Sequence, residues 1–200
     1  MTSMMPSGVE HILEGIVTTR NPDGTVNIAP MGPRVDAAME HFLLRPYPAS
    51  QTCRNLKALG EGVLHVTDDV LLLAKAAVGP VEPPPEMFPA EKVRGFVLRD
   101  ACRWYEFRVR TIDESEPRVR IECATVHAGR LRDFFGFNRA KHAVVEAAIL
   151  ATRTDFLPLE EIAAEYRKLA VIVDKTGGPR EHEAFAWLRA YVERVAGGRR

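Results

Sequence analysis

The sequence has few cysteines, no excess of either charge and no long apolar run. Its 200 residues include three cysteines without a CxxC pair, which argues against a disulfide scaffold or zinc knuckle and suits a reducing cytoplasm. Basic and acidic residues both number 27, so the chain lacks the basic surface that non-specific nucleic-acid binding requires. No apolar run approaches the roughly 20 residues that span a bilayer, and residues 1–10 lack a signal-peptide pattern. We therefore expect a cytoplasmic protein with no nucleic-acid or membrane partner.

The motifs of several large enzyme classes are also missing. There is no GxSxG, P-loop or GxGxxG, so the signals of nucleophile-elbow hydrolases, P-loop NTPases and Rossmann domains are absent. The six histidines show neither HxH nor HExxH spacing, so we expect no metal site. His65 is interpreted as a core or edge residue of a strand, 67–69 as a solvated acidic turn, and Cys53 as a buried, inert thiol.

The first two-thirds of the chain is patterned as strands. Two extended runs flank Asn21-Pro22-Asp23-Gly24 and predict a β-hairpin. A second antiparallel pair is predicted at 104–112 and 118–126, and single strands at 41–44, 62–67 and 95–99. Many short strands separated by turn signals favour an antiparallel barrel.

From about residue 134 the apolar spacing becomes helical. Three amphipathic helices are predicted, one starting at Asn138, one after Pro158 and one over 184–195. With short links between them they indicate a small bundle. The stretch 79–90 contains five prolines and is predicted to be an extended loop. It is either a linker between domains or a loop within one barrel, and the strands on both sides favour the loop.

The most informative stretch runs from Arg45 to Gly60. Ser50 is a natural N-cap and Gly60 a natural stop for a short helix. The N-terminus of this helix would carry the hydroxyls of Ser50 and Thr52, with Arg45 and Arg54 nearby. Free N–H groups, hydroxyls and guanidinium groups together suit a phosphate monoester. The alternative is an ordinary capped helix, since Ser is common at this position.

A second candidate is the strand end from Ala29 to Gly32. Pro30 removes a ladder donor and Gly32 allows close backbone approach. A flat ring could therefore lie against this small-residue edge; the alternative is a strand that simply leaves the barrel. Lys175, in the sequence KTGG, is either a cationic ligand contact or part of a basic last helical turn before a C-cap.

Taken together, four segments resemble the flavin-reductase-like split barrels. They are EGIVTT (14–19), NIAPMG (27–32), SQTCRNL (50–56) and GVLHVTDD (62–69). More closely, the chain resembles domain-of-unknown-function family 447, whose helical extension is similar to GFNRA (136–140) and KTGG (175–178). The resemblance covers nearly the whole chain.

The resemblance implies a mainly β fold with α: an antiparallel split β-barrel over 1–133 that binds FMN, followed by a small helical bundle over 134–200. It also implies a homodimer with flavin near the subunit interface. Carried over by residue, Ser50, Thr52 and Asn55 match the phosphate-side loop, and Ala29, Pro30, Met31 and Gly32 match the strand end that flanks the isoalloxazine. Thr18 and Thr19 lie on the neighbouring strand of the hairpin and are expected to face the ring, and Arg45 and Tyr47 are added from their position and charge.

The function so implied is that of a flavin-dependent oxidoreductase or flavin reductase of unknown substrate and electron donor. In that chemistry the flavin carries the electrons and the protein supplies binding and electrostatics, so no catalytic residue is named. The alternative is a non-catalytic flavin-binding or carrier protein acting through dimer or partner contacts. A third possibility is an enzyme that acts on another phosphorylated ligand, such as pyridoxal phosphate, in the same groove.

Overall fold

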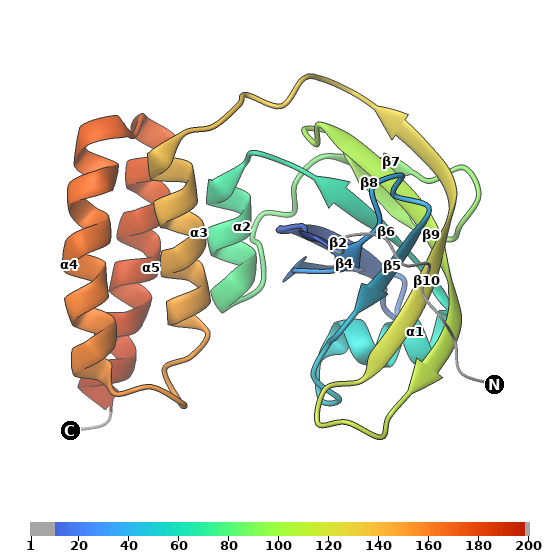
Figure 1. Ribbon diagram of the computed structural model, residues 1–200, viewed down its shortest axis with the longest axis horizontal. Coiled ribbons are helices and arrows are strands. Elements are labelled where there is room, and N and C mark those ends of the chain that lie inside the picture. The colour runs from blue at the N-terminus through green and yellow to red at the C-terminus, as the bar shows by residue number, and fades with distance from the viewer. Residues whose placement is uncertain (1–10, 199–200) are drawn as a thin grey trace. The chain divides into compact units, whose positions relative to one another are not determined.

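The computed structural model describes residues 11–198, which divide into two compact units (Figure 1). Of the described residues, the barrel unit is built from 11–67 and 85–133, and the helical unit from 68–84 and 134–198. The predicted boundary near residue 133 coincides with this division. The segment 68–84, which the sequence prediction left in the first domain, belongs instead to the helical unit.

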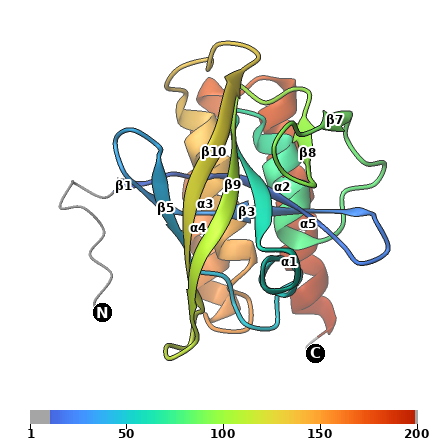
Figure 2. The same ribbon diagram turned by 90° about the vertical axis from the view of Figure 1, so that its right-hand side faces the viewer.

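Over the described residues, the barrel unit contains an eight-stranded antiparallel sheet with the order β1-β4-β5-β10-β9-β6-β2-β3. Its strands are β1 (His11–Ile12), β2 (Gly15–Arg20), β3 (Val26–Met31), β4 (Arg34–Val35), β5 (His41–Leu44), β6 (Glu61–Val66), β9 (Arg103–Asp113) and β10 (Arg120–Arg130). The hairpin of β9 and β10 is the longest and runs the height of the sheet (Figure 2). Both predicted hairpins are confirmed.

The connections show why this sheet must curl. β3 lies at one end of the strand order and β4 next to the other end, yet only Gly32 and Pro33 separate them in sequence. Because an extended residue spans at most about 3.6 Å, the two ends of the sheet are brought close together. Among residues 11–198, β3 still pairs with β2 alone, so the barrel remains open at this seam. The predicted split barrel is confirmed.

Helix α1 (Gln51–Leu59) packs against β2 and β3 and contributes Cys53 and Leu56 to the core of the barrel. The helix begins as predicted, because the Ser50 hydroxyl oxygen accepts a hydrogen bond from the Cys53 N–H at 3.2 Å. It ends as predicted at Gly60, whose φ of 66° lies in the left-handed region that glycine tolerates best. The other core residues come from alternate strand positions, as in Val17, Phe42, Leu44, Leu64, Phe107 and Ile121.

A small two-stranded sheet, β7 (Met87–Pro89) with β8 (Phe96–Leu98), also belongs to the barrel unit. His65 fastens it to the barrel, because its Nε2 accepts from the Leu98 N–H and its Nδ1 bonds the Ile16 carbonyl, both at 3.1 Å. Burial lowers the pKa of His65 to about 4, so the ring is neutral near pH 7. The interpretation of His65 as a core residue is confirmed.

The proline-rich stretch differs from its prediction in two ways. Its last residues form β7, and the division between the two units falls between Pro84 and Pro85. It is therefore the connection between the units, and the preference for a loop within one barrel was wrong. The element directly before the stretch is a helix over 70–78, which belongs to the other unit, rather than the strand that the sequence prediction placed there.

In the described part of the helical unit there are four helices rather than the three predicted: α2 (Val70–Val78), α3 (Arg139–Ala151), α4 (Leu159–Thr176) and α5 (Pro179–Gly198). The missed helix, α2, reads VLLLAKAAV, a nearly continuous apolar run whose periodicity does not distinguish a helix from a buried strand. Within residues 11–198, none of the helices is both long and apolar enough to cross a membrane.

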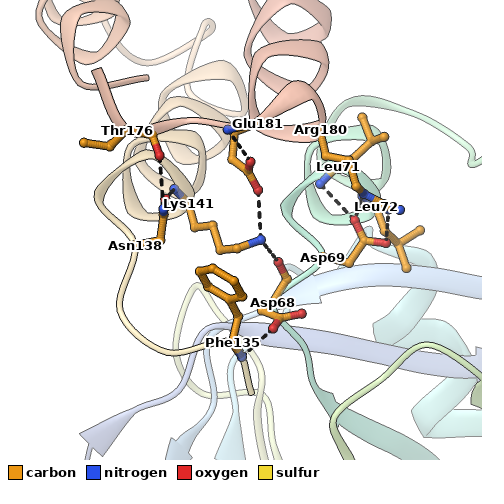
Figure 3. A network of polar contacts seen from close by, with 11 residues as sticks. Asp68, Asp69, Leu71, Leu72, Phe135, Asn138, Lys141, Thr176, Arg180 and Glu181 are labelled. Carbon is orange, nitrogen blue, oxygen red and sulfur yellow. Dashed lines mark hydrogen bonds and ion pairs between the residues drawn. The ribbon is translucent and has the colours of Figure 1, made fainter. Parts of the chain in front are cut away.

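The acidic residues before α2 are structural, which corrects their interpretation as a solvated turn. The Asp69 carboxylate caps α2 by accepting from the Leu71 and Leu72 N–H groups, both at 3.1 Å. Asp68 is buried, and its carboxylate accepts from the Phe135 N–H at 2.7 Å. Figure 3 shows Lys141 reaching the Asp68 carbonyl and the Glu181 carboxylate, both at 2.8 Å. These contacts join α2, α3 and α5.

Candidate functional site

A cluster of uncharged polar side chains gathers where the hairpin of β2 and β3 meets α1. Thr19 and Asn27 are a cross-strand pair of that hairpin, and Thr52 and Asn55 lie one turn apart on α1. Thr19, Thr52 and Asn55 are each at most 2% exposed. The hairpin turn sets the register that pairs Thr19 with Asn27, and the helical period puts Thr52 and Asn55 on the side facing them.

Hydrogen bonds connect these side chains directly. Asn27 Nδ2 donates to Thr52 Oγ1 at 3.0 Å and to Thr19 Oγ1 at 3.2 Å. Asn55 Nδ2 donates to Thr19 Oγ1 at 3.0 Å and to the side-chain oxygen of Asn21 at 2.8 Å. The cluster thus links three segments that lie up to 36 residues apart. Among the predicted site residues, the structure brings together Thr19, Thr52 and Asn55.

Ser50 lies at the start of α1, but its hydroxyl is already used by the chain. It donates to the Tyr47 carbonyl at 2.8 Å and accepts from the Cys53 N–H. The capped-helix interpretation is therefore what the structure shows for this side chain. The N–H groups of the first turn that a cap does not satisfy remain the characteristic donors of a helix N-terminus.

Arg45 and Tyr47 precede α1 and meet the tip of the β9–β10 hairpin. Arg45 Nη2 pairs with Glu116 Oε2 at 2.9 Å, and Arg45 Nε is buried without a hydrogen-bond partner among residues 11–198. The half-exposed Tyr47 ring is covered by the Arg118 guanidinium at 4.2 Å, and its hydroxyl accepts from Arg118 Nη2 at 2.7 Å. Among residues 11–198, Arg45 Nε and the hydroxyl hydrogen of Tyr47 are donors that these contacts leave without an acceptor.

Thr18 faces away from the cluster, because successive residues of a strand point to opposite faces. Its buried hydroxyl donates to the Phe96 carbonyl of β8 at 2.7 Å. The structure therefore separates Thr18 from Thr19, although the sequence prediction grouped them.

The predicted ring-flanking residues lie at the open edge of the sheet. Ala29, Pro30 and Met31 are half-buried in β3. Gly32 follows the strand, and a Cβ there would lie 3.1 Å from Ile12 Cγ2 and 3.2 Å from Glu14 Oε1. The space that this glycine leaves open is thus occupied by neighbouring residues of the same chain.

Sequence reasoning missed Asn27, an amide of the cluster, and also Asn21 and Gln51, whose amides bond to Asn55. A signal for Asn27 was present, since a hairpin turning at 21–24 aligns it with Thr19. No local pattern, however, indicates that α1 packs against that pair. The amide of Gln51 donates to Asn55 Oδ1 at 2.7 Å.

The cysteines are buried thiols with no sign of activation. Burial raises the pKa of Cys53, which agrees with its predicted inertness, and it also raises the pKa of Cys123. Across the part of the chain that the structure describes, no three His, Cys, Asp or Glu side chains gather in a way that would hold a metal ion. Lys175 lies in the last turn of α4, whose C-cap Gly177 donates its N–H to the Val173 carbonyl at 2.8 Å.

Comparison with known proteins shows a similar architecture elsewhere. An FMN-bound protein of family DUF447 from Methanosarcina mazei shares 22% identity, with a TM-score of 0.78 over 91% of this chain and 95% of that chain. The 2-nitrobenzoate 2-nitroreductase of Pseudomonas fluorescens has 14% identity and a TM-score of 0.53 over 60% of this chain and 64% of that one. The styrene monooxygenase flavin reductase of Pseudomonas putida S12 has 11% identity and a TM-score of 0.52 over 60% and 82%. These likenesses establish a shared fold.

Family models account for both units. The model described as "Protein of unknown function (DUF447) N-terminal domain" matches residues 13–132, and the one described as "Protein of unknown function (DUF447)" matches residues 138–190. The two matches together cover most of the barrel strands and most of the helices that follow them. The chain therefore belongs to the DUF447 family.

Proposed function

We propose that the barrel unit binds FMN, with the phosphate at the N-terminus of α1, and that the protein is a flavin-dependent oxidoreductase. The observation that carries the proposal is the polar cluster of Thr19, Asn27, Thr52 and Asn55 beside that helix N-terminus, in which all but the half-buried Asn27 are buried. Support comes from the family, one of whose members was solved with FMN bound, and from the fold shared with a flavin reductase.

The residues at the start of α1 fit a phosphate group. The Thr52 hydroxyl oxygen accepts a hydrogen bond from Asn27, and among residues 11–198 the hydroxyl makes no other. The hydroxyl hydrogen is therefore available to an acceptor. The unpartnered Nε of Arg45 is a second donor. Phosphate oxygens are strong acceptors, and they are favoured at helix N-termini by the free N–H groups and the helix dipole.

The open edge of β3 suits the isoalloxazine. The Asn21 N–H donates to the Thr25 carbonyl, so these two residues form a hydrogen-bonded pair of the hairpin. Since every second pair of an antiparallel ladder is hydrogen-bonded, Thr19–Asn27 and Val17–Ala29 are the next such pairs, and the backbone groups of Asn27 and Ala29 point toward β2. The backbone groups of Ile28 and the carbonyl of Pro30 then point to the open edge. A ring lying there would meet backbone donors and acceptors next to the half-buried Met31.

When bound, the flavin would supply the hydride or electron transfer. This chain's residues would bind and orient it: the start of α1 would hold the phosphate, and the edge of β3 would exclude water from one side of the ring. We also propose a homodimer with flavin near the subunit interface. It is supported by the seam left open beside β3, which a second subunit could cover.

One observation favours a second candidate, a non-catalytic flavin carrier. The side chains that form the cluster, Thr19, Asn27, Thr52 and Asn55, include no group that titrates near neutral pH. A carrier needs only to bind flavin, whereas a reductase must also admit an electron donor.

The test is the colour and redox behaviour of the purified protein. We expect a yellow protein that releases FMN rather than FAD, identified by chromatography, and that NADH or NADPH bleaches. A yellow protein that neither nucleotide bleaches would favour the carrier or a different electron donor. A colourless protein that also fails to bind added FMN would refute the proposal.

A further inference from the structure

Hydrogen-bond directions at the start of α1 are fixed by a charged residue at each end of a continuous chain. At one end the Asp23 carboxylate accepts from the Thr25 hydroxyl at 2.6 Å, and the Thr25 oxygen accepts from Asn21 Nδ2 at 2.9 Å. At the other end Arg54 Nη2 donates to Gln51 Oε1 at 2.7 Å. An ionised carboxylate only accepts and a guanidinium only donates, so neither end can reverse.

These ends determine the orientation of the Asn55 amide between them. Gln51 accepts from Arg54 through its oxygen, so its nitrogen faces Asn55 and donates to Asn55 Oδ1 at 2.7 Å. Asn55 must then present its nitrogen on the other side, where it donates to Asn21 and to Thr19 Oγ1. The Thr19 hydroxyl oxygen is thereby an acceptor. The two ends do not orient Asn27, because a hydroxyl such as that of Thr19 can accept and donate at once. In the structure it is Asn27 Nδ2 that lies toward both hydroxyls, donating to Thr19 Oγ1 and to Thr52 Oγ1.

Two hydroxyl hydrogens are left over, because Thr19 accepts from both Asn27 and Asn55 and Thr52 accepts from Asn27. Of the two, the Thr52 hydrogen is the one that lies in the first turn of α1. Since the oxygen accepts from Asn27, the hydrogen cannot be directed at that amide nitrogen. Thr52 is 2% exposed, and among residues 11–198 its hydroxyl makes no further hydrogen bond. A buried donor without an acceptor is costly. An acceptor on a bound ligand would remove that cost.

We propose that Asn27 is a positioning residue that, by donating to Thr52 Oγ1, commits the Thr52 hydroxyl to donate to the flavin phosphate. The site thereby selects a phosphate monoester whose oxygens all accept, over a ligand that presents a hydroxyl donor at the same place. The inference rests on the proposed function, because it assumes that the FMN phosphate lies at the N-terminus of α1.

The test reverses the polarity of residue 27. In Asn27→Asp an acceptor-only carboxylate replaces the donating nitrogen, so the Thr52 hydroxyl turns toward residue 27 and away from the phosphate. We expect the affinity for FMN to fall at least about tenfold, the value of a lost hydrogen bond to a charged group. Riboflavin, which has no phosphate, should bind within about twofold of its wild-type affinity.

Two controls separate polarity from charge and from general damage. Val26→Asp adds the same charge one residue earlier on β3, at a half-buried position whose side chain lies on the opposite face of the strand. It should lower FMN affinity less than about threefold, because the charge points away from the cluster and is screened by solvent and salt. In a Thr52→Val background, Asn27→Asp should lose most of its effect, since the hydroxyl through which it acts is gone. If the Asn27→Asp variant does not fold, Asn27→Ala takes its place. This variant should lower the affinity for FMN about threefold and leave the affinity for riboflavin unchanged.

The outcomes are distinct. A loss specific to FMN that disappears in the Thr52→Val background supports the inference. Equal losses for FMN and riboflavin, or the same loss with and without the Thr52 hydroxyl, would overturn it while leaving flavin binding intact. A wild-type protein that binds neither flavin overturns the proposed function and this inference with it. A wild type that binds FMN and riboflavin equally well shows that the phosphate lies elsewhere, which also overturns the inference.

Discussion

The substitution Thr52→Val tests directly whether α1 holds the phosphate. It removes one hydroxyl at nearly constant volume from a residue that is buried beside Asn27 and Asn55. The change leaves the Ser50 cap, the core residues of α1 and the β2–β3 register in place. Its effect should therefore appear in ligand binding more than in folding.

The expected magnitude follows from the bonds that Thr52 makes. A hydrogen bond to a charged group contributes roughly 1.5–3 kcal/mol, so the affinity for FMN should fall about ten- to a hundredfold. The free energy of unfolding should fall by only about 1 kcal/mol. Asn27 loses one acceptor, but its nitrogen keeps the bond to Thr19 Oγ1 at 3.2 Å.

Fluorescence titration of apo-protein with FMN and with riboflavin measures the effect, and circular dichroism with thermal unfolding checks the fold. Thr52→Ser keeps the hydroxyl and should retain FMN affinity within about threefold. If Thr52→Val binds FMN as tightly as the wild type and unfolds at a similar temperature, the phosphate is not held at this helix and the reasoning fails.

Three further predictions concern other parts of the molecule. Glu116→Gln removes the carboxylate that pairs with Arg45 at 2.9 Å and should raise the affinity for FMN up to about fivefold, the scale of an exposed ion pair. Glu114→Gln is the matched control, and an equal rise in FMN affinity in both variants would point to an effect of net charge. Lys141→Met leaves the carboxylate of Glu181, 10% exposed, without its partner and should lower the free energy of unfolding by about 2–3 kcal/mol at pH 7 in thermal or urea melts. Burial raises the pKa of Glu181, but hydrogen bonds from Lys141 and a backbone N–H outweigh it and hold that pKa below the ordinary 4.5. The ionised Glu181 therefore adds to the free energy of unfolding above pH 4.5, and this stabilisation is lost as the pH falls through the lowered pKa. In Lys141→Met that loss on acidification should be absent. Finally, in sedimentation of the full chain across a dilution series, the FMN-loaded protein should remain dimeric at lower concentrations than the apo-protein. A monomer that binds FMN with undiminished affinity would contradict the interface assignment.

Local features of the fold followed from the sequence because their causes are local. The start of α1 at Ser50 and its end at Gly60 depend on one side-chain cap and one residue with φ of 66°. The β2–β3 hairpin depends on the turn at 21–24. The helical period predicted α3, α4 and α5, because an amphipathic stripe has a distinct spacing. α2 has no such stripe, and its apolar run was missed.

What only the tertiary structure decided was which chemically similar residues come together. Thr18 and Thr19 are neighbours in sequence, but strand pleating gives one to the Phe96 carbonyl and the other to Asn55. Asn27 became part of the site because α1, 25 residues later, packs its Thr52 against that strand. Such contacts depend on how one element docks on another. That docking is set by the closure of the whole sheet and by burial of the core, neither of which leaves a signal in any single segment.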